Sequence, residues 1–103
     1  MKFAVRIHPQ AKEELRLARD YYWDIDPGLA VRLLGEHDIA LRYIMDFPNA
    51  GSLLFSSYRH VVLPHFPYMI IYLVIDDLIY VLSLVHTHRD PEWMKRTLDN
   101  RIT

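Results

Sequence analysis

Two arginines and several histidines in the second half of the sequence could carry acid–base or phosphate chemistry. The residues in question are Arg59, His60, His86, His88 and Arg89. An imidazole can give or take a proton near neutral pH, and a guanidinium can neutralise the charge of a phosphate group. A site that handles phosphate would therefore draw on this part of the chain.

Histidines could also suggest a metal site, and those of the second half lie at positions 60, 65, 86 and 88. None of them is spaced from another as two ligands on successive turns of one helix, and the chain has no cysteine. We therefore expect no metal ion and no other cofactor. The absence of cysteine also excludes disulfide bonds.

The elements that must position these residues are organised around residues 66–86, the most apolar stretch of the chain. Two runs rich in valine, isoleucine and tyrosine are separated by a pair of aspartates, which predicts a β-hairpin with a two-residue turn. Pairing outward from that turn places Ile75 opposite Leu78 and, further along, Met69 opposite Leu84.

Both faces of this predicted hairpin are apolar. An antiparallel sheet with one face in water normally alternates apolar and polar residues. We therefore expect helices of this chain to cover one face. The other face should stay open, and an exposed apolar face of that size usually marks an interaction site.

The flanking sequence supplies the remaining elements. Alternation predicts a strand over residues 2–8, and helical spacing predicts helices over 9–25 and from about 29 to 47. A further strand is expected at 58–63, and Pro91 can begin a short terminal helix. The order is β-α-α-β-β-β with a possible final helix. This is an α+β fold in which a helical hairpin packs on one face of a mostly antiparallel sheet.

Length and charge limit the class of protein. The chain has 103 residues and a formal net charge of −1, whereas domains that bind nucleic acid are usually strongly basic. Two aspartates in the middle of the apolar stretch exclude a membrane span. The first residues carry charge where a signal peptide would be apolar. We expect a single cytoplasmic domain over residues 1–103.

Five short motifs, in this order, resemble the RelE/ParE superfamily of bacterial toxins from type II toxin–antitoxin systems. They are His8-Pro9-Gln10-Ala11-Lys12-Glu13-Glu14-Leu15, Tyr21-Tyr22 followed by Pro27-Gly28-Leu29-Ala30, Phe47-Pro48-Asn49-Ala50-Gly51, Phe66-Pro67-Tyr68 with Tyr72, and His86-Thr87-His88-Arg89-Asp90-Pro91-Glu92-Trp93. Together they cover nearly the whole chain. The most similar subgroup is the ParE-like, plasmid-stabilisation branch. The resemblance implies a toxin that a cognate antitoxin holds inactive.

The resemblance leaves two kinds of target open. RelE-like members cleave mRNA in the ribosome, whereas ParE-like members poison DNA gyrase and have no hydrolytic site. Many RNA-cleaving relatives carry an arginine where this chain has Met69, and a thioether cannot stabilise a developing phosphorane. We therefore expect a ParE-like toxin that inhibits growth by binding a protein target such as gyrase. The alternatives are a ribosome-dependent mRNA endoribonuclease using Arg59, His86 and Arg89, or an inactive relative.

Two sets of residues follow from these alternatives. For His86 and Arg89 we favour a structural role at the end of the last strand, with Asp90 pairing with Arg89. The aromatic residues Tyr68, Tyr72 and Trp93 are the candidates for contact with a partner. The rings of the His65-Phe66-Pro67-Tyr68 loop and of Trp93 could also stack on bases, but we expect them to cap the core.

Overall fold

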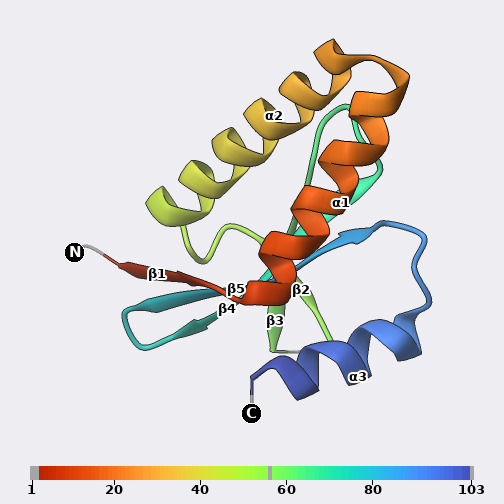
Figure 1. Cartoon of the computed structure of the whole chain (residues 1–103). Coiled ribbons are helices and arrows are strands. Elements are labelled where there is room, and N and C mark those ends of the chain that lie inside the picture. Colours follow the sequence, from red (N-terminus) through yellow and green to blue (C-terminus); the bar gives the residue numbers. More distant parts are fainter. Residues whose placement is uncertain (1–2, 56, 103) are drawn as a thin grey trace.

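The computed structural model describes residues 3–55 and 57–102, which form the seven predicted elements in the predicted order and one additional short strand. These elements are β1 (Ala4–Ile7), α1 (Pro9–Ile25), α2 (Pro27–Asp46), β2 (Ser52–Leu54), β3 (Tyr58–Val62), β4 (Tyr68–Ile75), β5 (Leu78–His86) and α3 (Pro91–Arg101) (Figure 1). The short strand β2 lies where the sequence suggested only a loop. The final helix is present.

The five strands form one sheet in the order β1-β5-β4-β3-β2. Only the pairing of β1 with β5 is parallel, so the sheet is mostly antiparallel as predicted. The hairpin of α1 and α2 lies on one side of the sheet and α3 on the other (Figure 1). Within the described part of the chain, no helix is both long and apolar enough to cross a membrane.

Local capping explains where the two long helices begin. The His8 side chain accepts a hydrogen bond at Nδ1 from the Gln10 N–H, 3.0 Å away, at the start of α1. Asp26 accepts one from the Gly28 N–H at 2.9 Å, and Pro27 occupies the first position of α2. The second helix therefore begins two residues earlier than predicted, because the proline and glycine belong to its first turn.

The central hairpin has the predicted two-residue turn, but its register changes along the strands. The four pairs nearest the turn are as predicted. A β-bulge then gives β5 one additional residue, Leu82, so that Ile71 lies opposite Ser83. The predicted pairing of Met69 with Leu84 is therefore wrong. Apolar periodicity cannot reveal an inserted residue when the side chains on both faces are apolar.

The second face of the sheet is not left open, which corrects another expectation. Met94 and Leu98 of α3 are buried there against Met69, Ile71 and Leu82. Because most residues of α3 are polar, its short apolar stripe was not predicted to cover the sheet. The surplus apolar surface of the hairpin is thus satisfied largely within the chain, and a binding surface has to be sought elsewhere.

Candidate functional site

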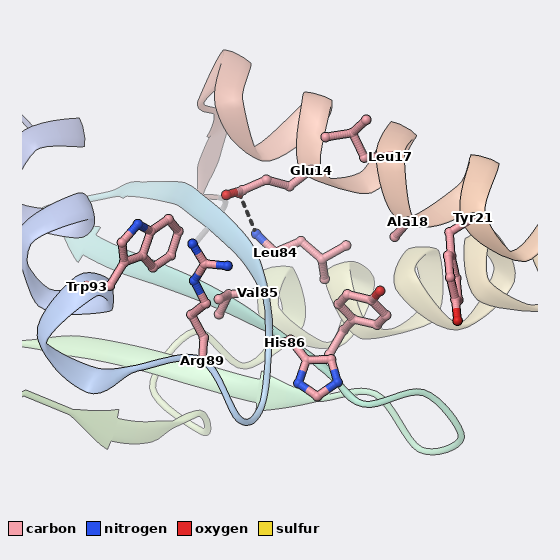
Figure 2. Close-up of a pocket in the computed structure, with 10 residues that line it drawn as sticks. Glu14, Leu17, Ala18, Tyr21, Leu84, Val85, His86, Arg89 and Trp93 are labelled. Atoms are coloured by element: carbon pink, nitrogen blue, oxygen red, sulfur yellow. Dashed lines mark hydrogen bonds between the residues drawn. The ribbon is translucent and has the colours of Figure 1, made fainter.

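An open groove of about 410 Å³ lies between α1, the adjoining ends of β4 and β5, and the start of α3 (Figure 2). Four of the candidate residues line it together: Tyr68, His86, Arg89 and Trp93. They come from the start of β4, the end of β5, the loop that follows and the first turn of α3. The fold therefore joins residues that the sequence separates by up to 25 positions, from 68 to 93.

The wall of the groove on the α1 side is apolar. Leu17, Ala18 and Tyr21 project from α1, and Leu84 lies on β5 across from them (Figure 2). Leu17 is 55% exposed and Tyr21 is 61% exposed, which is high for side chains of this size. The sequence reasoning missed this wall. The cluster Tyr21-Tyr22-Trp23, too large for one helix face, was the signal that could have found it.

His86 is exposed and lies between two aromatic neighbours. Its ring makes an edge-to-face contact with Tyr68, with centroids 5.7 Å apart, and another with His88 at 5.5 Å. Its Nδ1 accepts a hydrogen bond from the His88 N–H at 3.1 Å. The Nδ1 atom is thus unprotonated in this arrangement, and Nε2 is the atom available to donate.

Arg89 stacks on Trp93, with its guanidinium carbon 3.9 Å from the centroid of the indole ring. This is a cation–π contact of the kind that arginine favours. The expected pair between Arg89 and Asp90 is not what holds the loop. The Asp90 carboxylate instead accepts a hydrogen bond from the Trp93 N–H at 3.2 Å and caps α3. Helix capping outweighed charge pairing because the carboxylate lies directly before the helix.

Tyr68 is half-buried and stays a neutral hydroxyl over a wide pH range. Burial raises the pKa of its phenol, and the neighbouring Tyr22 and Tyr21 raise it further. The rings of Tyr22 and Tyr68 meet edge to face at 6.3 Å. Tyr68 can therefore offer a hydrogen-bond donor and an aromatic face, but no anion at neutral pH.

A mostly buried ion pair of Glu14 and Arg101, whose side chains are 20% and 11% exposed, lies at one end of the groove beside the β-bulge. The Glu14 carboxylate accepts a hydrogen bond from the Leu84 N–H at 3.1 Å (Figure 2). It accepts another from the Ser83 hydroxyl at 3.0 Å. Arg101, at the end of α3, donates to both oxygens of Glu14 and to the Leu82 carbonyl. The pair thus satisfies backbone groups of β5 at and next to the bulge.

The other two candidate residues lie outside the groove. Tyr72 is 0% exposed, and its hydroxyl donates to the Pro48 carbonyl at 2.7 Å. Arg59 donates to the carbonyls of Asn49 and Gly51 at 3.1 and 2.8 Å. Both side chains hold the turn after α2 against the sheet. Tyr72 is therefore inaccessible to a partner, contrary to its selection as a contact residue.

The remaining histidines of the second half do not assemble a metal site. The His60 Nδ1 lies 3.0 Å from the Ser52 carbonyl oxygen, and the His65 ring contacts the Glu36 carboxylate at 2.8 Å. Among the residues that the structure describes, no group of three or more histidine and carboxylate side chains could hold a metal ion. His60 and His65 thus have separate partners on Ser52 and Glu36.

Comparison with known proteins supports the resemblance to ParE-like toxins. Residues 5–91 match the family model described as the ParE toxin of the type II toxin–antitoxin system parDE. The chain is 31% identical over 98 residues to Toxin ParE2 of two Mycobacterium tuberculosis strains, covering 94% of this chain and 93% of the relative.

Two solved structures share the fold. One is the chromosomal ParDE system of P. aeruginosa, with a TM-score of 0.73 at 16% identity over 82% of this chain and 96% of that one. The other is a mutant of the E. coli toxin RelE in the free state, with a TM-score of 0.68 at 18% identity over 100% of both chains. The family match and the similarity to ParE2 assign the sequence: the chain belongs to the ParE toxins of type II toxin–antitoxin systems.

Proposed function

We propose that this toxin inhibits growth by binding a protein target, DNA gyrase, and that it does not cleave mRNA. The observation that carries the proposal is the position of the cations. Arg59 is bound to two backbone carbonyls, outside the groove that contains His86 and Arg89. Met69, at the position where RNA-cleaving relatives carry arginine, is buried on the α3 side of the sheet.

The chemistry of the groove supports binding rather than hydrolysis. Cleavage of RNA needs an acid, a base and cations around one phosphate. The groove has one exposed imidazole, one arginine stacked on tryptophan and a tyrosine whose pKa is raised by burial. Its walls are mainly apolar and aromatic, as in the core of a protein interface.

A cognate antitoxin is the second partner, as the family implies. We infer that it binds over the groove and keeps the toxin inactive in the cytoplasm. The endoribonuclease alternative rests on a specific observation, since His86 and Arg89 line the same groove beside Trp93. These side chains would supply one acid or base, one cation and one stacking ring, which is part of what that reaction needs.

The test is to express the toxin without its antitoxin and to follow two readouts together. We expect intact mRNA across start codons and gyrase-linked DNA breaks with a damage response. His86→Ala should leave the mRNA as intact as in the parent toxin. Arg42→Ala, at an exposed site on α2, is the matched control. Codon-positioned mRNA cuts that disappear in His86→Ala would instead establish the endoribonuclease.

A further inference from the structure

The guanidinium of Arg89 is held in the groove by Trp93 but has no carboxylate partner among the described residues. Stacking on Trp93 uses the flat face of the Arg89 side chain and leaves its N–H edges free to turn outward. Within residues 3–55 and 57–102, no carboxylate forms an ion pair with Arg89. The nearest one in sequence, Asp90, is occupied in capping α3. A guanidinium held in this way is preorganised for a planar anion.

The other polar side chains that line the groove do not cancel the positive charge of Arg89. Glu14 is the one carboxylate among the residues that line the described groove, and Arg101 neutralises it through two hydrogen bonds. His86 lies beside Arg89, and its Nε2 can donate a further hydrogen bond. The groove is therefore locally cationic, although the whole chain has a formal net charge of −1.

We propose that the groove is a docking site for a segment of the cognate antitoxin that carries a carboxylate flanked by apolar side chains. The carboxylate binds Arg89 in a bidentate manner, and the apolar side chains lie on Leu17 and Tyr21. This inference deepens the proposed function, because it rests on the chain being a toxin that an antitoxin neutralises. It says nothing about the target, so gyrase and mRNA do not enter it.

Charge complementarity favours a protein segment over a nucleic acid as the occupant. An RNA backbone needs several cations along its length, whereas this groove offers one arginine and exposed apolar side chains on α1. An acidic segment with apolar neighbours satisfies both features at once. The carboxylate is drawn to the cation, and the apolar residues remove Leu17 and Tyr21 from water.

The experiment uses an array of overlapping 15-residue peptides that tile the antitoxin encoded beside the toxin gene. A second array replaces each aspartate and glutamate by its amide. The full-length toxin carries Trp23→Phe, so that Trp93 is its one remaining tryptophan and reports on the groove by fluorescence. We expect the strongest peptide to contain a carboxylate and to shift the Trp93 emission. The amide replacement should weaken its binding at least tenfold.

Variants of the toxin complete the design. Arg89→Gln should weaken the same peptide at least tenfold, and Arg89→Lys should restore only part of the loss, because lysine cannot bind in a bidentate manner. Arg42→Gln, at a 72% exposed arginine side chain on α2, should bind normally. Circular dichroism and melting curves confirm that each variant is folded.

Three results would overturn the inference. The first is a strongest peptide without an acidic residue, or one that binds Arg89→Gln as well as the parent. The second is that no peptide binds while the intact antitoxin binds the parent and Arg89→Gln equally. The third is that a single-stranded RNA oligonucleotide shifts the Trp93 emission through Arg89 and no acidic peptide does. Loss of gyrase-linked breaks would contradict the proposed function and leave the docking site untouched.

Discussion

Strand β4 carries two tyrosines at two levels along the strand, Tyr72 and Tyr68, each of which shares its surroundings with an arginine from another part of the chain, and the two sets of residues have opposite roles. At one level Tyr72 and Arg59 are directed at backbone carbonyls and hold the turn that follows α2. At the other level Tyr68 and Arg89 line an open groove. Residue type alone does not separate a structural pair from a binding pair. The polar partners that the backbone brings within reach make the difference.

The two levels are also fixed by different devices. Gly51 brings the backbone so close that its N–H donates to the Tyr72 hydroxyl at 3.2 Å. The groove level depends on the β-bulge and on the ion pair between Glu14 and Arg101. Substitutions can remove each of these contacts separately. The predicted losses in unfolding free energy are largest for the ion pair at the bulge and smallest for the exposed Arg89.

The largest loss is expected for Glu14→Ala. This change leaves the mostly buried Arg101 without its counter-ion and the Leu84 N–H without an acceptor. Breaking a buried pair on one side typically costs roughly 3–5 kcal/mol, so urea unfolding should show a loss of about 3 kcal/mol. Glu14→Gln keeps an acceptor and should lose less. An unchanged unfolding midpoint in Glu14→Ala would show that the bulge is held by other contacts.

The next largest loss is expected for Gly51→Ala. A Cβ at this position would lie 2.3 Å from the Tyr72 hydroxyl oxygen, so either the turn or the ring has to move. Overpacking of this kind costs about 1–3 kcal/mol. Gly35→Ala is the matched control, because an added Cβ meets nothing within 4 Å there and alanine favours a helix. Thermal melting of both variants checks the contrast.

The sequence predicted the order of elements and the family well, since both rest on periodicity and on motifs that are local in the chain. The bulge was not predictable, because an additional Leu82 leaves the apolar pattern intact on both faces. The role of Glu14 was missed because a charge on an amphipathic helix is usually solvated. Its actual partners, Ser83 and Arg101, are 69 and 87 positions away.

A smaller difference is expected between Tyr72→Phe and Tyr68→Phe. The Tyr72 hydroxyl serves two backbone groups, the Pro48 carbonyl and the Gly51 N–H, and burial raises its pKa. Losing that buried hydroxyl should reduce the free energy of unfolding by about 1–2 kcal/mol. Tyr68→Phe should lose clearly less, because its half-buried hydroxyl lines the groove and serves neither of those backbone groups. Equal losses for the two variants would remove the distinction between the two levels.

The smallest difference in stability, and the sharpest contrast in function, is expected between the two arginine variants. Arg59→Ala removes hydrogen bonds to two carbonyls, which should cost about 1 kcal/mol in urea unfolding. Arg89→Ala loses only the exposed stacking on Trp93, worth roughly 0.5 kcal/mol. Binding of the intact antitoxin, measured by titration calorimetry, should change in the reverse order.

Arg89→Ala should therefore weaken the antitoxin complex strongly while its unfolding curve stays close to that of the parent. Arg59→Ala should bind almost normally despite its lower stability, because its side chain faces the turn and not the groove. Arg59→Lys keeps the charge and should recover part of the stability without any change in binding. If Arg59→Ala instead weakened binding as much as Arg89→Ala, the turn after α2 would belong to the antitoxin interface. The two levels of β4 would then form one continuous surface.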